Sequence, residues 1–148
     1  MINPRGNNPA GQQSGSILRI ATNELVDLVF EMAIYYTNMN RKWSSGHMIV
    51  FVHKTKLGDA FVGYGSIERA LEKDALSQEE QTECFRGGWK RAIEFRYVKR
   101  FAKPLLIKDT FFKTSKLRGR YFHGLRLSEQ QLEDLLQYSD VRKIHQKS

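Results

Sequence analysis

The sequence contains a single cysteine, Cys84. One cysteine cannot form an intramolecular disulfide or a cysteine-rich zinc site, so neither is available to hold the fold together. A reactive thiol is one reading of Cys84, and an inert small apolar side chain is the commoner one. The chain also lacks any run of about 18 uncharged apolar residues, and we therefore expect no membrane partner.

The first fifteen positions, MINPRGNNPAGQQSG, lack the basic and apolar regions of a signal peptide, which predicts a cytoplasmic protein. Residues 1–16 are rich in Asn, Gly, Gln, Pro and Ser and predict a disordered tail. Hydrophobic residues make up 41% of the sequence, enough for the core of one domain. We place that domain at residues 17–138 and a second tail at residues 139–148.

Positive charge is abundant and unevenly distributed. The formal net charge is +8, and residues 86–126 contain 13 Lys and Arg against two Asp and Glu. Residues 1–85 contain 8 against 10, and residues 127–148 contain 3 against 4. Such a dense basic segment favours polyanions through counterion release, and nucleic acid is the commonest such partner. An ordinary charged surface and an acidic protein partner are the alternatives.

Apolar spacing predicts the elements of the first half of the domain. A strand over residues 16–22 precedes a helix over 24–37, whose apolar residues recur every three or four positions. Residues 37–46, TNMNRKWSSG, are mostly polar and predict a loop that presents an aromatic side chain. The next segment, HMIVFVHK, is apolar on both alternating faces, which is typical of a central strand covered on both sides.

A hairpin connects that strand to AFVGYGSIERAL, where Gly63 and Gly65 leave one face of the strand bare. Either a helix or the flat face of a ligand could pack there, and a helix is the simpler prediction. Residues 72–88 show no clear period and predict a loop with one helical turn. Residues 89–105 alternate clearly and predict a strand that Pro104 ends or places at an edge.

The end of the domain has strong helix signals. Ser128 and Gln131 form a capping box in front of a leucine-rich stripe, which predicts a helix over residues 129–138. A short turn or helix around residues 109–113 and a basic loop precede it.

Four motifs occur in the order that is typical of the PUA-like superfamily: "GHMIVFVH", "FVGYGSIERAL", "WKRAIEFRYVKRFAKPL" and "FHGLRLSEQQLEDLL". Over residues 17–138 the chain most resembles EVE-type domains, which are relatives of YTH and ASCH domains. The resemblance implies an α+β fold: a PUA-like bent β-barrel of about five or six strands with peripheral helices. It also implies RNA or DNA binding, with one base, sometimes a modified one, held near the aromatic loop.

In this sequence the equivalent loop offers Trp43 for stacking, with Asn38 or Asn40 to read the base edge and Arg41 and Ser44 beside them. The alternative is that Trp43 only plugs the end of the barrel. The predicted function is therefore a nucleic-acid-binding module for RNA or single-stranded DNA. The oligomeric state is left open.

The phosphate backbone would be tracked by basic residues of the strand and of the following loop, beside stackable rings at residues 121–123. The predicted contacts are Lys90, Arg96, Arg100, Lys116, Arg118, Arg120 and His123.

An enzyme is the alternative reading, because ASCH relatives include hydrolases that use a Lys and a Glu. Lys90 and Glu94 share a strand face, although a cross-strand ion pair explains them better than catalysis does. A hydrolase would act on a modified nucleoside. The sequence assigns no catalytic residue, no metal site and no cofactor, since His47 and His53 lack further ligands and no phosphate-binding glycine loop opens a helix.

Overall fold

A computed structural model describes residues 13–114 and 119–137. Its centre is one mixed six-stranded sheet in the order β2-β5-β4-β3-β1-β6. The strands are β1 (Gln13–Ile20), β2 (Ile34–Thr37), β3 (Met48–Thr55), β4 (Gly58–Glu72), β5 (Arg91–Leu106) and β6 (Arg126–Ser128). β1 and β3 run parallel, and the other neighbours are antiparallel.

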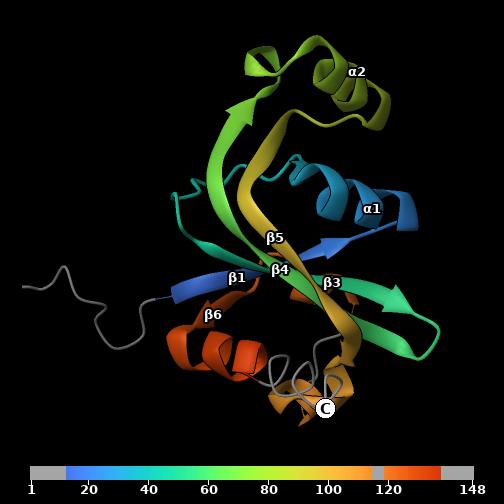
Figure 1. Cartoon of the computed structure of the whole chain (residues 1–148), viewed down its shortest axis with the longest axis vertical. Helices are drawn as coiled ribbons and strands as arrows, with labels where there is room; N and C mark the ends of the chain where they lie inside the picture. The colour runs from blue at the N-terminus through green and yellow to red at the C-terminus, as the bar shows by residue number, and fades with distance from the viewer. Residues whose placement is uncertain (1–12, 115–118, 138–148) are drawn as a thin grey trace, which may run out of the picture.

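Helices lie around this sheet (Figure 1). They are α1 (Asn23–Met32), α2 (Gln78–Gly87) and a C-terminal helix over residues 129–137, with short 3-10 turns η1 (Lys73–Ala75), η2 (Ile107–Asp109), η3 (Phe111–Thr114) and η4 (Gly119–Phe122). Figure 1 shows β4 and β5 as two long curved strands, with α2 at one end of the molecule and the C-terminal helix at the other. No helix of the described ranges is long and apolar enough to cross a membrane.

The predicted barrel is not closed. β2 and β6 are the two ends of the strand order, and no ladder joins them within the described residues. β6 pairs with the first half of β1, and the residues before β6 continue along that strand as far as Ile17, which exchanges backbone hydrogen bonds with Gly124 and Leu125. In the described residues no ladder joins the end of β1 to β2. The Tyr35 hydroxyl of β2 spans this gap and donates a hydrogen bond to the carbonyl oxygen of Arg19 on β1, at 2.7 Å. We call this gap between β1 and β2 the seam.

The predicted helix over residues 24–37 is too long. Thr22 caps the start of α1, and the helix ends at Met32 because Ala33 takes the left-handed conformation, with φ of 56°. Ile34–Thr37 then form β2, paired with β5. A run of β-branched and aromatic residues favours a strand once an edge is available, which overrides the continued helical spacing.

The loop predicted at residues 72–88 is also wrong in part. Ser77 and Glu80 make a reciprocal capping box, and α2 follows it. The sequence contains this capping box, which is a helix-start signal. However, α2 is polar on almost every face, so the apolar period that usually identifies a helix is missing. Pro104 does not end its strand either, since β5 continues to Leu106 past a bulge in its pairing with β4. At the N-terminus, β1 begins at Gln13, inside the predicted tail.

Other predictions are confirmed. β3 lies between β1 and β4 in the sheet, with its middle buried on both faces, and a tight hairpin joins it to β4. The bare face at Gly63 is a seat for α1, because a Cβ there would lie 2.5 Å from Cζ of Phe30. The prediction does not hold for Gly65, which faces β5, where a Cβ would lie 3.0 Å from Phe95. Ser128 and Gln131 form the predicted reciprocal capping box, with both bonds at 3.1 Å.

Candidate functional site

A cleft of about 490 Å³ occupies the seam. Its lining comes from the end of β1, from β2 and the residues that follow it, and from two segments that approach from other parts of the chain: Arg19, Ala21, Tyr35, Tyr36, Thr37, Asn38, Met39, Trp89 and His123. A smaller recess of about 120 Å³ shares several of these residues and reaches Leu25, Leu28 and Val29 of α1. The cleft therefore has a polar mouth and an apolar inner part, which is the usual composition of a small-molecule or base site.

One wall of the cleft is a pair of stacked aromatic rings. Tyr36 and Trp89 have centroids 5.4 Å apart and planes 12° apart. Trp89 follows the end of α2, and its ring passes so close to Gly87 that a Cβ at that position would collide with it. Tyr36 is buried, and burial is the main cause that raises the pKa of its phenol to about 12. The wall is thus neutral, flat and fixed in place by the turn after α2.

Asn38 anchors the start of the aromatic loop at the mouth of the cleft. Its side-chain amide donates to the carbonyl oxygen of Gly88 at 3.0 Å, and its oxygen accepts from the backbone N–H of Lys90 at 2.8 Å. Arg91 donates to the carbonyl oxygens of Asn38 and Met39, while Glu72 binds the same guanidinium. Asn38 therefore lines the cleft, and its side chain has one N–H and one lone pair left for a ligand.

Trp43 lies further along the same loop and does not line the cleft. Its ring is half-buried, Arg41 lies over it at 5.2 Å, and His47 is 5.8 Å away. Gly124 makes room for this arrangement, since a Cβ there would lie 3.2 Å from Nη2 of Arg41. The indole Nε1 of Trp43 and Nη1 of Arg41 are buried with no hydrogen-bond partner among the described residues. Asn40 and Ser44 are exposed in this loop.

Beside the seam, five basic side chains from four segments form what we call the cationic cluster: Arg19, Arg41, His47, His123 and Arg126. His123 accepts a hydrogen bond through Nδ1 from the backbone N–H of Arg19 at 3.0 Å. Arg126 is paired with Ser16 across β6 and β1, and the Ser16 hydroxyl is 2.9 Å from Nε2 of His47. Of the five, only Arg19 has a carboxylate within ion-pair distance in the described part of the chain, Asp59 at 3.9 Å.

These like charges act on one another. Partial burial lowers the pKa of Arg41, and Arg126 lowers it further. Burial is also the first cause that lowers the pKa of His47, followed by Arg41 and Arg126. The pKa of His123 is lowered by burial and then by Arg41 and Arg19. Both imidazoles are therefore neutral near pH 7, and the cluster is a region of positive potential that an anion would relieve.

The predicted basic residues of β5 have a different environment. Arg96 pairs with Glu68 at 3.1 Å and donates to the Ser45 hydroxyl, and Arg100 lies 3.8 Å from Asp27 and over the ring of Phe30. These arginines therefore lie near carboxylates of β4 and α1, which are outside the basic segment and were not counted against its charge.

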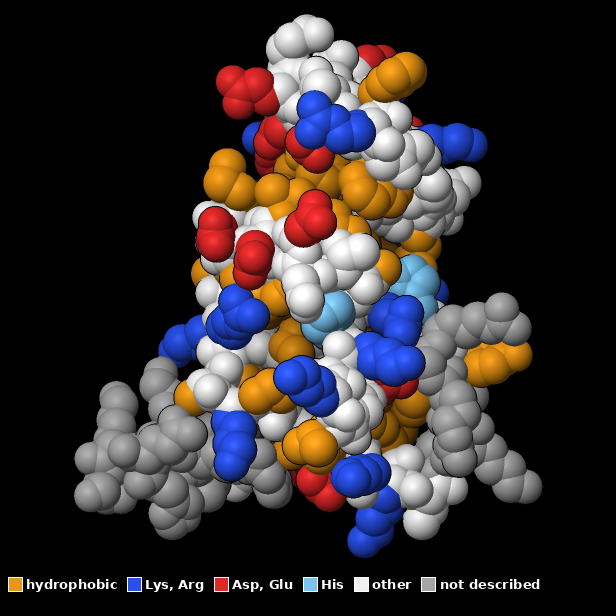
Figure 2. Space-filling model, turned by 90° about the vertical axis from the view of Figure 1, so that its right-hand side faces the viewer, with side chains coloured by type: hydrophobic (Ala, Val, Ile, Leu, Met, Phe, Trp, Pro, Cys, Tyr) orange, Lys and Arg blue, Asp and Glu red, His pale blue; other side chains and the backbone are white. Residues whose placement is uncertain are grey.

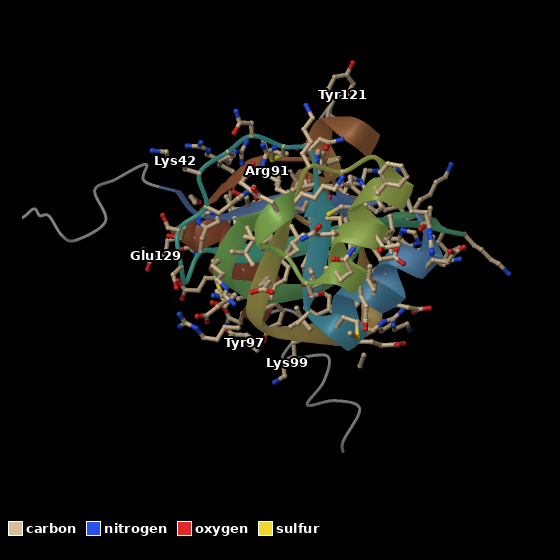
Figure 3. All side chains as sticks on the ribbon, turned by 90° about the horizontal axis from the view of Figure 1, so that it is seen from above. Lys42, Arg91, Tyr97, Lys99, Tyr121 and Glu129 are labelled. Carbon is tan, nitrogen blue, oxygen red and sulfur yellow. The ribbon has the colours of Figure 1, made fainter. Side chains whose placement is uncertain are left out.

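Figure 3 shows that β5 also presents side chains to the other side of the molecule. Tyr97 and Lys99 lie along one edge of this view, whereas Lys42 and Tyr121 lie along the opposite edge, with Arg91 near them. The basic segment is thus divided between two sides. Figure 2 shows the face toward which β1 ends: Lys and Arg gather around and below two histidines, and Asp and Glu gather mainly above, where α1 and α2 lie.

The remaining predicted residues fall into three groups. Lys116, Arg118 and the side chain of Arg120 lie outside the described residues. Lys90 is exposed beside Asn38. Glu94 accepts from Arg69 at 2.7 Å across β4 and β5, so the cross-strand ion pair exists with Arg69 as the partner.

Sequence reasoning missed Arg19, Arg126 and the Tyr36–Trp89 pair as parts of a site. Arg19 and Arg126 lie at opposite ends of the domain in the sequence, and the apolar spacing predicts a helix at Tyr36. Of these residues, only Trp89 could have been noticed in the sequence, because it directly follows Gly87-Gly88, a pair that predicts a tight turn.

Comparisons with known proteins agree on the fold. The ASCH protein from Zymomonas mobilis has a crystal structure similar to this chain, with a TM-score of 0.62, 10% identity, and coverage of 84% of this chain and 94% of that one. Two single-residue variants of that protein match at the same TM-score and identity, covering 84% and 85% of this chain and 98% and 96% of theirs. No family model matches the sequence, and no curated protein does.

The chain therefore has an α+β fold of the ASCH type. The similarity is to the fold of an ASCH protein and does not single out EVE-type domains. At 10% identity the likeness describes the fold alone, so the function has to be argued from the cleft and the cationic cluster.

Proposed function

We propose that this chain binds single-stranded nucleic acid, RNA or DNA, and holds one base in the seam cleft. The observation that carries the proposal is the stacked Tyr36–Trp89 wall of a cleft whose surroundings are cationic. An aromatic face accepts any base by stacking, and nearby cations bind the phosphates on either side of it. The ASCH-type fold is consistent with this role.

In this proposal the predicted site residues divide their roles. Asn38 reads the edge of the base with the hydrogen-bonding capacity it has left, and His123 is a second polar residue of the cleft lining. Arg41 and Trp43 form the rim rather than the stacking platform. Lys90, Asn40 and Ser44 are exposed at the approach to the mouth, where a strand would enter. Arg96 and Arg100 contribute less, because carboxylates already pair with them.

We further propose that the base held in the cleft is a modified one. The inner recess between β2 and α1 is lined by Leu25, Leu28 and Val29, and it continues the cleft past Tyr36. A methyl or acetyl group on a bound base would be buried against these aliphatic side chains, and such burial is favourable at about 0.8 kcal/mol per methylene. Binding of matched modified and unmodified nucleosides would test this extension.

The main proposal is tested by titrating a labelled pentathymidylate and pentauridylate at rising salt. Phosphate neutralisation predicts an affinity that falls linearly with salt on logarithmic axes. Trp89→Leu should weaken binding about 5- to 150-fold, the worth of one stacked base. Tyr97→Leu is the matched control, because Tyr97 is an exposed ring on the other side of the molecule (Figure 3).

A Trp43→Phe protein provides a direct readout, since it retains Trp89 as its one tryptophan. Stacking of a base on Trp89 should then quench the remaining fluorescence. Equal losses for Trp89→Leu and Tyr97→Leu, or an affinity indifferent to salt, would rule out the proposal.

A further inference from the structure

The cationic cluster has more hydrogen-bond donors than the described residues satisfy. Nη1 of Arg41 and Nε of Arg19 are buried without a partner in the described ranges. A buried unpaired donor is costly, so both atoms call for an acceptor, and the positive charge of Arg126 acting on Arg41 favours an acceptor that is also an anion. Arg41 is held in this position by Trp43 below it and by Gly124 beside it.

We propose that the cationic cluster is a phosphate site in which Arg41 and Arg126 bind the oxyanion, His123 donates one fixed hydrogen bond, and His47 takes up a proton when the phosphate binds. The proposal rests on the proposed function only in taking the phosphate to be that of a nucleic acid. Guanidinium groups suit this ligand because their planar donors match two phosphate oxygens at once.

The two histidines have different roles because their hydrogen bonds differ. The backbone N–H of Arg19 can only donate, so Nδ1 of His123 has to accept and the ring carries its hydrogen on Nε2. Protonation of Nδ1 would break that bond. His123 therefore stays neutral and offers Nε2–H, and its ring lies in the lining of the cleft.

His47 has no such restriction. Its Nε2 is 2.9 Å from the Ser16 hydroxyl, which can donate to the neutral ring and accept from the protonated one. The charged groups that face it are Arg41 from the aromatic loop and Arg126 from β6, and both oppose its protonation.

Carboxylates also lie near these elements, and Asp59 of β4 is 3.9 Å from Arg19 of the cluster. On the β4 side Glu68 is paired with Arg96. Glu129 begins the C-terminal helix after β6 and serves as a control position. An oxyanion placed among Arg41, Arg126 and His47 reverses the local potential, so its binding favours the imidazolium.

The linkage has a definite sign. In the free protein His47 has a pKa below its ordinary value, and acid therefore destabilises the fold as pH falls below about 6.5. A ligand that raises this pKa binds more tightly as pH falls. A one-unit rise corresponds to an affinity that increases toward acid pH by at most about tenfold, and the full factor is reached only below both pKa values. An internal phosphodiester does not titrate in this range, so proton uptake would belong to the protein.

The experiment follows the histidine resonances by NMR from pH 5 to 8.5 in the full chain, with sodium sulfate as a non-titrating tetrahedral anion and sodium acetate at equal ionic strength. Sulfate should raise the pKa of His47, leave His123 as the Nε2–H tautomer, and have more effect than acetate. Pentathymidylate with and without a 5′-phosphate then separates an internal diester from a terminal monoester as the natural ligand.

Variants localise the effect. Arg126→Gln, on an exposed β6 residue, should reduce sulfate and oligonucleotide binding and the shift at His47, whereas Lys99→Gln on the other side and Glu129→Gln should not reduce them. His47→Gln should lose the pH dependence, so that its affinity at pH 6 falls to the affinity measured at pH 8. Equal effects of Arg126→Gln and Lys99→Gln, or an unchanged His47 pKa in sulfate, would overturn the phosphate site. If pentathymidylate binds in a salt-dependent way that Arg126→Gln does not change, the phosphate site is refuted and the proposed function is kept. If sulfate shifts the pKa of His47 but no oligonucleotide binds, the proposed function is refuted and the phosphate site is kept.

Discussion

Removing the Tyr35 hydroxyl tests whether the seam is held together by that group. The hydroxyl donates to the carbonyl oxygen of Arg19 at 2.7 Å and joins β2 to β1 where no ladder does within the described residues. Tyr35→Phe deletes this donor and keeps the buried ring, which packs beside Phe51. The change is therefore confined to one hydrogen bond.

The expected loss of stability depends on the Arg19 carbonyl oxygen, which the substitution leaves without its hydrogen-bond donor. A hydrogen bond contributes about 0.5–1.5 kcal/mol net, and an acceptor left unsatisfied in the interior costs about 1–3 kcal/mol. The Arg19 carbonyl borders the cleft, where water can reach it in part, so we expect a loss of about 1–2 kcal/mol in the free energy of unfolding. For a chain of this size that corresponds to a fall in Tm of about 2–8 °C.

Urea unfolding followed by far-UV circular dichroism measures this loss, with oligonucleotide titration on the same samples. Tyr97→Phe is the matched control, because its ring is 46% exposed and its hydroxyl has only a weak contact with Met48 Sδ at 3.9 Å. We expect the control to stay within about 0.5 kcal/mol of the parent. If both variants unfold at the same urea concentration as the parent, the hydroxyl does not hold the seam and this reasoning is refuted.

Three further predictions concern the seat of α1, the aromatic wall and alkaline pH. Gly63→Ala places a methyl 2.5 Å from Cζ of Phe30 and should cost about 1–3 kcal/mol in urea unfolding; parent-like stability would contradict the close packing. Gly87→Ala should displace the Trp89 ring, seen as a changed tryptophan signal in near-UV circular dichroism with reduced oligonucleotide affinity, and an unchanged spectrum would argue against the fixed wall. Above pH 10 the free energy of unfolding should fall, because Tyr36 ionises near pH 10 when unfolded but has a pKa of about 12 in the fold; Tyr36→Phe should make the fall shallower, and identical alkaline curves would disprove this cause.

Local features of the fold could be predicted from the sequence because they depend on neighbours a few residues apart. The capping box of Ser128 and Gln131 and the hairpin between β3 and β4 are of this kind, and both are present. Gly63 was a further local signal, since a bare strand position needs a partner that comes close. The boundary at Ala33 could not be predicted in this way, because the helical spacing continues through β2 and only the free edge of β5 decides the outcome.

The sequence by itself determined that the chain is basic, that it has one domain's worth of core, and that an aromatic loop precedes a buried central strand. Only the tertiary structure decided which charges stay unpaired. Arg96 and Arg100 meet carboxylates from β4 and α1, whereas Arg41 and Arg126 have no carboxylate partner among the described residues and lie near enough for Arg126 to lower the pKa of Arg41. Electrostatic interactions depend on distance through space, and the strand order sets those distances between segments that are far apart along the chain.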